Sequence, residues 1–401
     1  MGKVIITERN NRLLLFLMDD SNHPQMIQTA SCQGEDILGN IYVGRVAEIL
    51  SGIQAAFVSI SKGEKVFLPL RECEKPLLTG REYDGSLKPG DGLVIQIATK
   101  ALKTKLPSAT TRLSLTGKYC VCRLDSHGIS YSGKLTQGQV ARLKCAISGR
   151  QIPDRKKCGF IIRTNAGALE DMSPLFQEME YFLSVFKGLQ EKYKYRPCYT
   201  CLYSSEPEIV TGLKGIPLDA YDEVVTDSEI AYNQISTSPF LSGNLRFYQD
   251  PMVSLAALYS LEGHLKRALE KRVWLPSGGY LVIEPTEAMV VVDVNSGKAS
   301  GVKKIKQEKL YLQTNLEAAK ELARQLRLRN YSGMIMVDFI NMELEEHNRL
   351  LMDTLDRHLR EDKGKTRLVD MTALGIVEIT RKKSSSPLMD FFHNSPAGRD
   401  G

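Results

Sequence analysis

Residues 289–298, "MVVVDVNSGK", decide how the C-terminal part of this chain folds. Four apolar residues precede Asp293, and a single valine separates this aspartate from Asn295. A short apolar run rich in β-branched residues predicts a buried strand. An ionised carboxylate is costly in that setting unless something compensates for its lost hydration. We therefore expect Asp293 to have a partner.

A second stretch, "GMIMVDFINM" at residues 333–342, repeats the pattern of four apolar residues followed by an aspartate, Asp338. Apolar residues recur at helical spacing over residues 316–328, so a helix is expected between the two strands. A strand, helix and strand unit places its strands parallel, often as neighbours about 4.8 Å apart. Asp293 and Asp338, 45 residues apart in sequence, would then meet at the edge where open α/β sheets bind ligands.

Repulsion between two such carboxylates has two natural solutions, a shared proton or a divalent cation. Magnesium is the better fit, because it binds through one or two carboxylates and completes its shell with waters and phosphate oxygens. Asn295 lies on the same face as Asp293 and can orient a carboxylate or a water. One alternative stays open: each aspartate caps a turn or pairs with an arginine. Basic residues at Lys298 and 381–383 are expected near the aspartates, where they would suit a phosphate backbone or a solvated basic face.

The composition is that of a globular protein with more than one domain. The 401 residues are 42% hydrophobic and 25% charged, and the net charge of +6 is compatible with an anionic partner without establishing one. Apolar runs are too short for a membrane span or a signal peptide, so a cytoplasmic location is expected. The eight cysteines are scattered, which favours reduced thiols, and the Cys198 and Cys201 pair is interpreted as structural.

The N-terminal third is expected to form a small barrel of the oligonucleotide-binding (OB) type. Its short strands, joined by turn residues, are predicted at 41–50, 53–60, 65–70 and 93–97. One helix is expected at 173–191, and another from Asp250 and Pro251, as N-cap and first residue, towards residue 271. Residues 384–401 are rich in Ser, Pro and Gly and are predicted to be a flexible tail.

Four collinear blocks resemble signature sequences of the ribonuclease E/G family. They are "VWLPSGGYLVIE" (273–284), "TEAMVVVDVNSGKAS" (286–300), "TNLEAAKELARQLRLRNYSGMIMVDFINM" (314–342) and "ALGIVEITRKK" (373–383). The similarity covers nearly the whole chain and is weaker at about 80–153. It implies a magnesium-dependent endoribonuclease that hydrolyses single-stranded RNA to 5′-phosphate and 3′-hydroxyl ends, in rRNA processing and mRNA decay.

The resemblance also implies a multidomain fold of the α+β and α/β classes. An RNase H-like layer is interrupted by an OB-fold (S1-like) barrel and a 5′ sensor subdomain, and a DNase I-like catalytic subdomain follows. The implied boundaries are 1–36 and 207–275 for the RNase H-like layer, 37–117 for the barrel, 118–206 for the sensor, 276–383 for the catalytic subdomain and 384–401 for the tail.

The family's active-site residues fall on three positions of this sequence. Asp293 and Asp338 would hold the magnesium ion, and Asn295 would position Asp293. The metal and the RNA phosphate would then neutralise the paired charge, which answers the question raised by the first strand. The resemblance also implies RNA binding by Phe57, Phe67 and Lys105, and the basic residues Lys298 and Lys365 are further candidates for RNA binding. Aromatic rings on such a barrel stack on unpaired bases, although phenylalanines are as often part of a core.

The stretch "GFIIRTNAG" at 159–167 resembles the family's pocket for a 5′ monophosphate. Arg163 and Thr164 would clamp the phosphate, and Gly128 would accompany them, with Ser132 at a position that is apolar in the family. An arginine in a surface ion pair is the simpler alternative for Arg163.

The family usually carries a C-P-x-C pair that links two subunits through zinc, after a segment that corresponds to residues 378–383. This chain has no cysteine beyond Cys201, so a homodimer would form without a zinc link. The alternative function is a catalytically inactive RNA-binding or ribosome-associated protein of the same fold.

Overall fold

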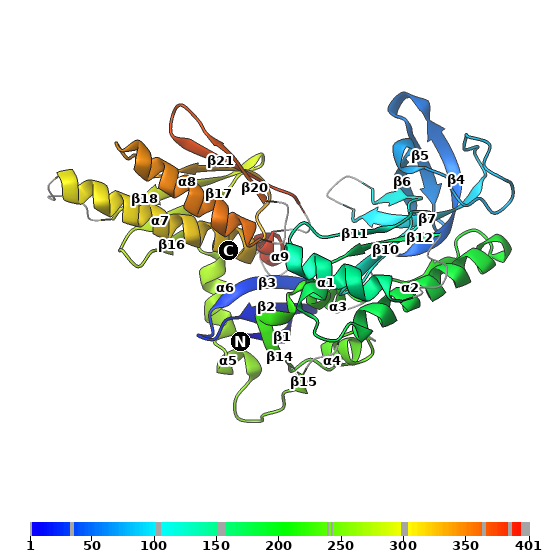
Figure 1. Cartoon of the computed structure of the whole chain (residues 1–401), viewed down its shortest axis with the longest axis horizontal. Coiled ribbons are helices and arrows are strands. Elements are labelled where there is room, and N and C mark those ends of the chain that lie inside the picture. The colour runs from blue at the N-terminus through cyan, green and yellow to red at the C-terminus, as the bar shows by residue number, and fades with distance from the viewer. Residues whose placement is uncertain are drawn as a thin grey trace. The chain divides into compact units, whose positions relative to one another are not determined.

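The computed structural model of the chain falls into two compact units. The first contains residues 1–32, 220–232 and 243–401, and the second contains 33–219 and 233–242. Figure 1 shows the helices and strands of both. The structure describes residues 2–32, 36–101, 106–150, 157–238, 240–241, 244–297, 304–362, 366–383 and 387–393.

The first unit begins with a sheet that the chain leaves and later completes. Its strand order is β15-β14-β1-β2-β3, where β1–β2–β3 is an antiparallel meander and β14 pairs in parallel with β1. Asn10 and Asn11 both have positive φ (51° and 59°), which is the conformation of a two-residue hairpin turn. The strands are β1 (Gly2–Arg9), β2 (Arg12–Met18), β3 (Pro24–Ser31), β14 (Tyr221–Thr226) and β15 (Asn244–Phe247).

The helix expected from Asp250 and Pro251 towards residue 271 begins later, at Leu255, and is divided into two. The Asp250 carboxylate accepts the backbone N–H groups of Met252 and Val253 (2.8 and 3.2 Å) and closes a turn. Ser254 is the N-cap of α5 (Leu255–Leu258), and Ser260, with φ of 50°, separates α5 from α6 (Leu261–Leu269). An aspartate followed by proline is typical of turns as well as of helix starts.

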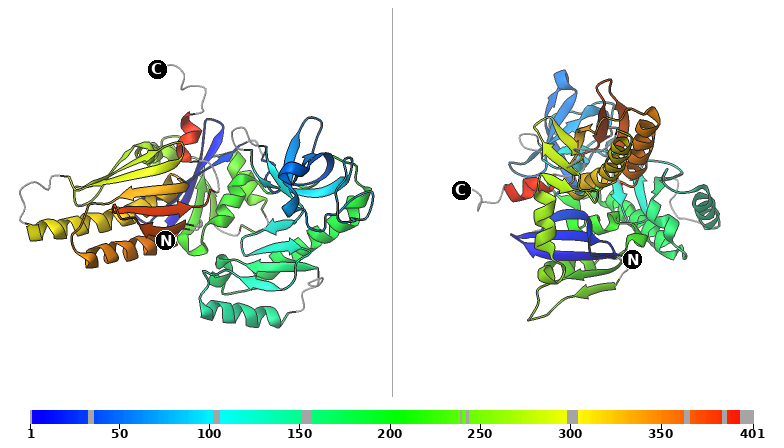
Figure 2. Two further views of the ribbon diagram at one scale, coloured as in Figure 1. Left: turned by 90° about the horizontal axis from the view of Figure 1, so that it is seen from above. Right: turned by 90° about the vertical axis from the view of Figure 1, so that its left-hand side faces the viewer.

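The second sheet of this unit carries the two aspartate strands. Its order is β16-β17-β18-β19-β21-β20, and helices α7 and α8 lie side by side along one face (Figures 1 and 2). The expected helix at 316–328 is confirmed as the C-terminal part of the longer α7. The elements are β16 (Arg272–Trp274), β17 (Tyr280–Pro285), β18 (Met289–Asn295), α7 (Lys304–Leu328), β19 (Gly333–Asp338), α8 (Glu345–Arg360), β20 (Thr366–Met371) and β21 (Ile376–Arg381).

The prediction that the aspartate strands are fully buried is wrong. Val292 and Val294 point into the core formed with α7 and α8, whereas alternate residues emerge on the opposite face. On that face Val291 is 41% exposed and Met334 is 50% exposed. We call it the open face of the sheet. The helices cover one face only, and a run of apolar residues in the sequence does not reveal this.

In the second unit a small barrel is confirmed, consistent with an OB fold. Strand β4 pairs with both β5 and β7, and β8 joins β6 to β7, so five strands close on themselves. The strands are β4 (Ile41–Leu50), β5 (Ala55–Ser59), β6 (Lys65–Pro69), β7 (Gly92–Thr99) and β8 (Ser108–Thr110), and β13 (Cys201–Tyr203) adds to the edge of β4.

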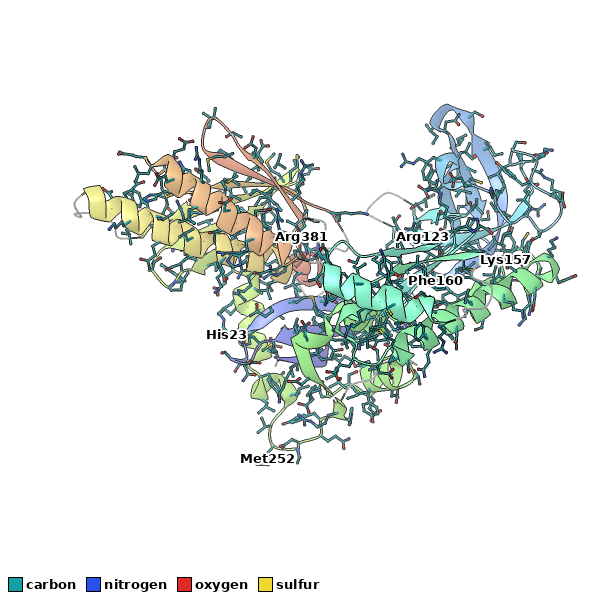
Figure 3. The ribbon with its side chains drawn as sticks, in the orientation of Figure 1. His23, Arg123, Lys157, Phe160, Met252 and Arg381 are labelled. Atoms are coloured by element: carbon teal, nitrogen blue, oxygen red, sulfur yellow. The ribbon has the colours of Figure 1, made fainter. Side chains whose placement is uncertain are left out.

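The rest of the second unit is a four-stranded sheet, β11-β12-β10-β9, with helices packed against it. Phe160 of β12, labelled in Figure 3, lies in this core with Phe182 and Phe186 of α2, the helix expected at 173–191. The elements are β9 (Ser114–Thr116), β10 (Cys120–Leu124), β11 (Ile129–Tyr131), α1 (Gln137–Ser148), β12 (Cys158–Ile162), α2 (Ser173–Lys192) and α3 (Glu208–Gly215), and α4 (Glu229–Ser236) follows β14.

Part of the segment expected to be a flexible tail is ordered. Helix α9 (Leu388–His393) buries Leu388 in the core of the first unit, and the Arg12 guanidinium lies 4.7 Å from the centre of the Phe391 ring. Residues 388–393 are therefore docked on the first unit. Within the described ranges, every helix is too short or too polar to cross a membrane.

The basic residues 381–383 were expected to lie near the aspartates, and this is wrong for Arg381. It pairs with Gly333, at the opposite end of β19 from Asp338. Its side chain is buried, with Nε 2.6 Å from an Asp362 oxygen, and it also donates to the Tyr331 carbonyl (Figure 3). Arg381 therefore stabilises the base of the sheet and is not available to a phosphate.

Candidate active site

Asp293 and Asp338 lie side by side on the open face of the second sheet. Strands β18 and β19 are parallel neighbours, as expected, and their register pairs the two aspartates directly. Neighbouring strands are about 4.8 Å apart, so the two carboxylates share one small space. Both side chains are exposed to solvent. The arrangement concentrates two negative charges where a ligand can reach them.

Asn295 fixes the orientation of the first carboxylate. Its Nδ2 donates a hydrogen bond of 2.6 Å to Oδ2 of Asp293. Because the two residues are two positions apart on one strand, both side chains emerge on the same face. The bond occupies one oxygen of Asp293 and leaves the other oxygen, and the Asp338 carboxylate, for a ligand.

Close backbone packing holds the end of β18 in place. The hairpin between β16 and β17 is closed by the Leu275 N–H, which donates to the Gly279 carbonyl at 2.8 Å. A Cβ atom at Gly279 would lie 2.7 Å from the Asn295 carbonyl oxygen, and one at Gly297 would lie 2.5 Å from the Gly278 oxygen. Glycine is therefore required for this hairpin to lie against the chain that follows Asn295.

The surroundings of the aspartates bear on the alternative that each of them caps a turn or pairs with an arginine. Among the described residues, neither Asp293 nor Asp338 caps a turn or forms an ion pair with an arginine or lysine. Two like charges held together in this way favour a bound cation.

The donor set suits a particular class of cation. Within the described ranges, His, Cys, Asp and Glu side chains form no group of three or more that could hold a metal. A pair of carboxylates matches a hard cation such as Mg²⁺ or Mn²⁺, which retains waters and accepts oxygens from a substrate. A zinc site would need three or four protein ligands.

Phe57 and Phe67 form an aromatic pair on the barrel. They are cross-strand partners on β5 and β6, with ring centres 6.1 Å apart in an edge-to-face arrangement. Both are partly exposed, whereas their neighbours Val58 and Val66 are fully buried. The rings are thus accessible to a ligand. The three predicted lysines, Lys105, Lys298 and Lys365, lie outside the described residues.

Arg163 and Thr164 follow the end of β12. The Arg163 guanidinium donates to the Gly117 carbonyl, and its pKa is lowered by burial although the Glu178 charge opposes the shift. In the described part of the chain, no carboxylate forms an ion pair with Arg163. The exposed Thr164 hydroxyl lies 3.2 Å from that of Ser132.

Gly128 is not brought to this group. It precedes β11, where its carbonyl accepts the Phe160 N–H at 3.0 Å, whereas Ser132 follows the same strand. Four residues of extended chain separate Gly128 from Ser132, or about 13 Å. The structure therefore brings together Arg163, Thr164 and Ser132.

The sequence analysis did not identify Glu178 as a structural residue. Its carboxylate holds the loop before β10 in place. This fully buried carboxylate accepts the backbone N–H groups of Lys118, Tyr119 and Cys120 at 2.6 to 2.8 Å. Burial lowers the pKa of Lys118, whose ammonium forms no hydrogen bond among the described residues. The only signal in the sequence is a glutamate at a core position of an amphipathic helix.

A cavity of about 470 Å³ lies apart from the candidate residues, at the ends of β1 and β14. The Thr7 hydroxyl donates to Asp227, and the Ser228 hydroxyl donates to Glu8. Burial, and then the nearby Glu8 charge, raises the pKa of Asp227. None of the residues predicted to bind RNA or metal lines this cavity.

Comparison with known proteins gives consistent matches. A sequence model described as "Ribonuclease E/G family" matches residues 114–384, a range that contains both aspartates and Arg163. Ribonuclease G of Escherichia coli (strain K12) is 33% identical over 366 residues, covering 87% of this chain and 73% of the relative. Ribonuclease G of Haemophilus influenzae is 31% identical, covering 88% and 74%. Ribonuclease E of a Nostoc species is 28% identical, covering 98% of this chain and 57% of the relative.

Asn295→Ala should weaken divalent-cation binding by about 10- to 100-fold, because Asp293 loses the hydrogen bond that orients it. Mn²⁺ binding, followed by electron paramagnetic resonance, measures this without any substrate. Glu284→Gln removes an exposed carboxylate from the neighbouring strand β17 and serves as the control. Equal Mn²⁺ affinities for Asn295→Ala and the unaltered protein would contradict the positioning role.

Proposed function

Because the chain belongs to the ribonuclease E/G family, we propose that it hydrolyses single-stranded RNA at a magnesium ion held by Asp293 and Asp338. Family membership makes it an endoribonuclease, a hydrolase of RNA phosphodiester bonds that acts in RNA processing and decay. The observation that carries the metal site is the direct pairing of two solvent-exposed carboxylates across parallel strands.

In this proposal the chain's own residues hold and orient the reacting groups. Asp293 and Asp338 supply the negative ligands, and Asn295 keeps Asp293 in one orientation. When bound, the ion supplies Lewis-acid activation of the phosphate and a water of lowered pKa. Attack by water in line with the 3′ oxygen would leave a 5′ phosphate and a 3′ hydroxyl. His347, the histidine nearest in sequence to Asp338, has its Nδ1 3.0 Å from Glu308, so a histidine-based mechanism has no support here.

The barrel is proposed to select single strands. Phe57 and Phe67 present partly exposed rings, and stacking on aromatic rings requires bases that are not paired in a duplex. We assign residues 37–117 to this S1-like barrel and 118–206 to a 5′ sensor. Residues 1–36 and 207–275 form the RNase H-like layer, in keeping with the sheet that the chain leaves after β3 and completes with β14 and β15. Residues 276–383 form the DNase I-like catalytic subdomain.

A 5′ monophosphate is proposed to stimulate cleavage through Arg163 and Thr164. An arginine fork next to a hydroxyl is a suitable clamp for a phosphate. The Arg163 guanidinium donates to a backbone carbonyl and feels the charge of the buried Glu178, but among the described residues it forms no ion pair with a carboxylate. This observation favours an anion over the surface ion pair that the sequence left open.

The alternative is a catalytically inactive RNA-binding protein of the same fold. Two exposed carboxylates in direct register, oriented by an asparagine, have no evident use in RNA binding alone, because they repel phosphates when no metal is present. The geometry therefore favours catalysis.

Asp293→Asn is expected to lower the rate of cleavage of a 5′-monophosphorylated single-stranded RNA by about 10²–10³-fold or more, since charge stabilisation at the phosphate is lost. RNA binding should survive, as measured by fluorescence anisotropy. Chelation of divalent ions should have the same effect on the unaltered protein, and Glu284→Gln should cut normally. A protein that binds RNA but never cuts it, with any divalent ion, would support the alternative.

Arg163→Ala should abolish the advantage of a 5′-monophosphorylated RNA over the same RNA with a 5′ hydroxyl. The loss follows from removal of a charge-assisted contact. The ratio of the two cleavage rates is the measurement, because a general folding defect lowers both rates together. Arg123→Ala, on neighbouring strand β10, is the control (Figure 3). An unchanged ratio in Arg163→Ala would rule out this residue as the sensor.

A further inference from the structure

An unexplained aromatic group lies on the open face of the catalytic sheet. Trp274, the single tryptophan of the chain, is 64% exposed at the end of β16. Its ring centre is 5.2 Å from that of Tyr280 on β17. The Arg272 guanidinium lies 4.5 Å from the centre of the Tyr280 ring and 5.7 Å from that of Trp274. We call Arg272, Trp274 and Tyr280 the aromatic platform.

The register of the sheet places this platform next to the paired carboxylates. Trp274 pairs with Tyr280, and Tyr280 pairs with Asn295 on β18. Asn295 in turn contacts Asp293. The tryptophan is thus two strands from Asn295, about 10 Å away along the same edge.

The platform residues face solvent and do not belong to the core. Val273 and Leu281, which alternate with them along β16 and β17, pack on the opposite side against the core of the unit. Water contact with a large, mostly exposed apolar ring is unfavourable. A ligand that covers the ring removes this contact, which favours binding.

We propose that the aromatic platform stacks a base of the RNA strand next to the phosphate that reaches Asp293 and Asp338. This inference rests on the proposed function and deepens it. Every nucleobase has a π-face, so stacking here would hold the strand without demanding a particular sequence. The Arg272 guanidinium adds a cation–π contact and a positive charge beside the RNA backbone.

An RNA strand fits this surface better than a second copy of the chain. The open face also carries the exposed carboxylates of Asp293 and Asp338. A protein interface across this face would strip them of water without supplying compensating charges. RNA brings phosphates, which a cation between the two aspartates can bridge.

The single tryptophan makes the test direct, because fluorescence excited at wavelengths longer than the tyrosine absorption band reports on Trp274 alone. The full chain carrying Asp293→Asn, which prevents cleavage and removes one of the two charges that repel phosphate, is titrated with a single-stranded RNA decamer. Stacking of a base should quench the fluorescence in a saturable way. A decamer of the same length without bases should bind, as measured by anisotropy, and leave the fluorescence unchanged. Equal quenching by both decamers, or none by either while RNA binds, would overturn the proposal.

Substitution provides a second measurement. Trp274→Ala should weaken binding of the RNA decamer by about 5- to 150-fold, the range expected for one stacked base. The baseless decamer should bind equally well to Trp274→Ala and to the unaltered protein. Tyr195→Ala, an 85% exposed tyrosine in the other unit, is the matched control and should bind RNA normally. Equal losses for both decamers would overturn stacking.

Failure of the aromatic platform and failure of the proposed catalytic function give different results. A protein that quenches with RNA but never cuts it would retain the platform and lose the catalytic proposal. A protein that cuts RNA without quenching would retain catalysis and lose the platform. A blue shift of the fluorescence that grows with protein concentration, in the absence of RNA, would assign this surface to a second copy of the chain and would also overturn the proposal.

Discussion

The mutual repulsion of Asp293 and Asp338 is the constraint on which the functional part of the molecule depends. Parallel pairing of β18 and β19, with α7 as the connection, forces the two carboxylates to the same point of one sheet edge. Asn295 limits how far Asp293 can turn away from its neighbour. The two carboxylates are therefore held close together, and a divalent cation would relieve their repulsion; a cation with open coordination positions could also bind a phosphate.

In the proposed function, different side chains bind the phosphates and the bases of the RNA. The carboxylate pair would act on the phosphate through a metal, whereas the rings of Phe57, Phe67 and Trp274 would offer surfaces to bases. Arg163 is suited to the terminal phosphate. Contacts to phosphates and stacking on bases carry little sequence information, which is the property expected of a nuclease that processes many RNAs.

The sequence predicted the parts of the fold that rest on local pattern and on chain topology. The parallel neighbours β18 and β19 followed from a strand, helix and strand order, and this placed Asp293 against Asp338 correctly. The exposure of that face was not predictable, because it depends on where α7 and α8 pack. The predicted location of Arg381 was wrong for a related reason: residues of one signature block can lie at opposite ends of a strand, and Arg381 lies at the end away from Asp338. Glu178 was missed because its partners are backbone groups.

The central claim is that a metal ion held by the aspartate pair contacts the RNA phosphate that is cut. The most direct measurement replaces a non-bridging oxygen of the scissile phosphate by sulfur and compares cleavage in Mg²⁺ and Mn²⁺. Sulfur is a poor ligand for the hard Mg²⁺ ion and a better one for Mn²⁺. We predict slow cleavage in Mg²⁺ that Mn²⁺ restores, and no restoration in Asp293→Asn. Equally slow cleavage in both ions, or restoration that persists without Asp293, would contradict the account.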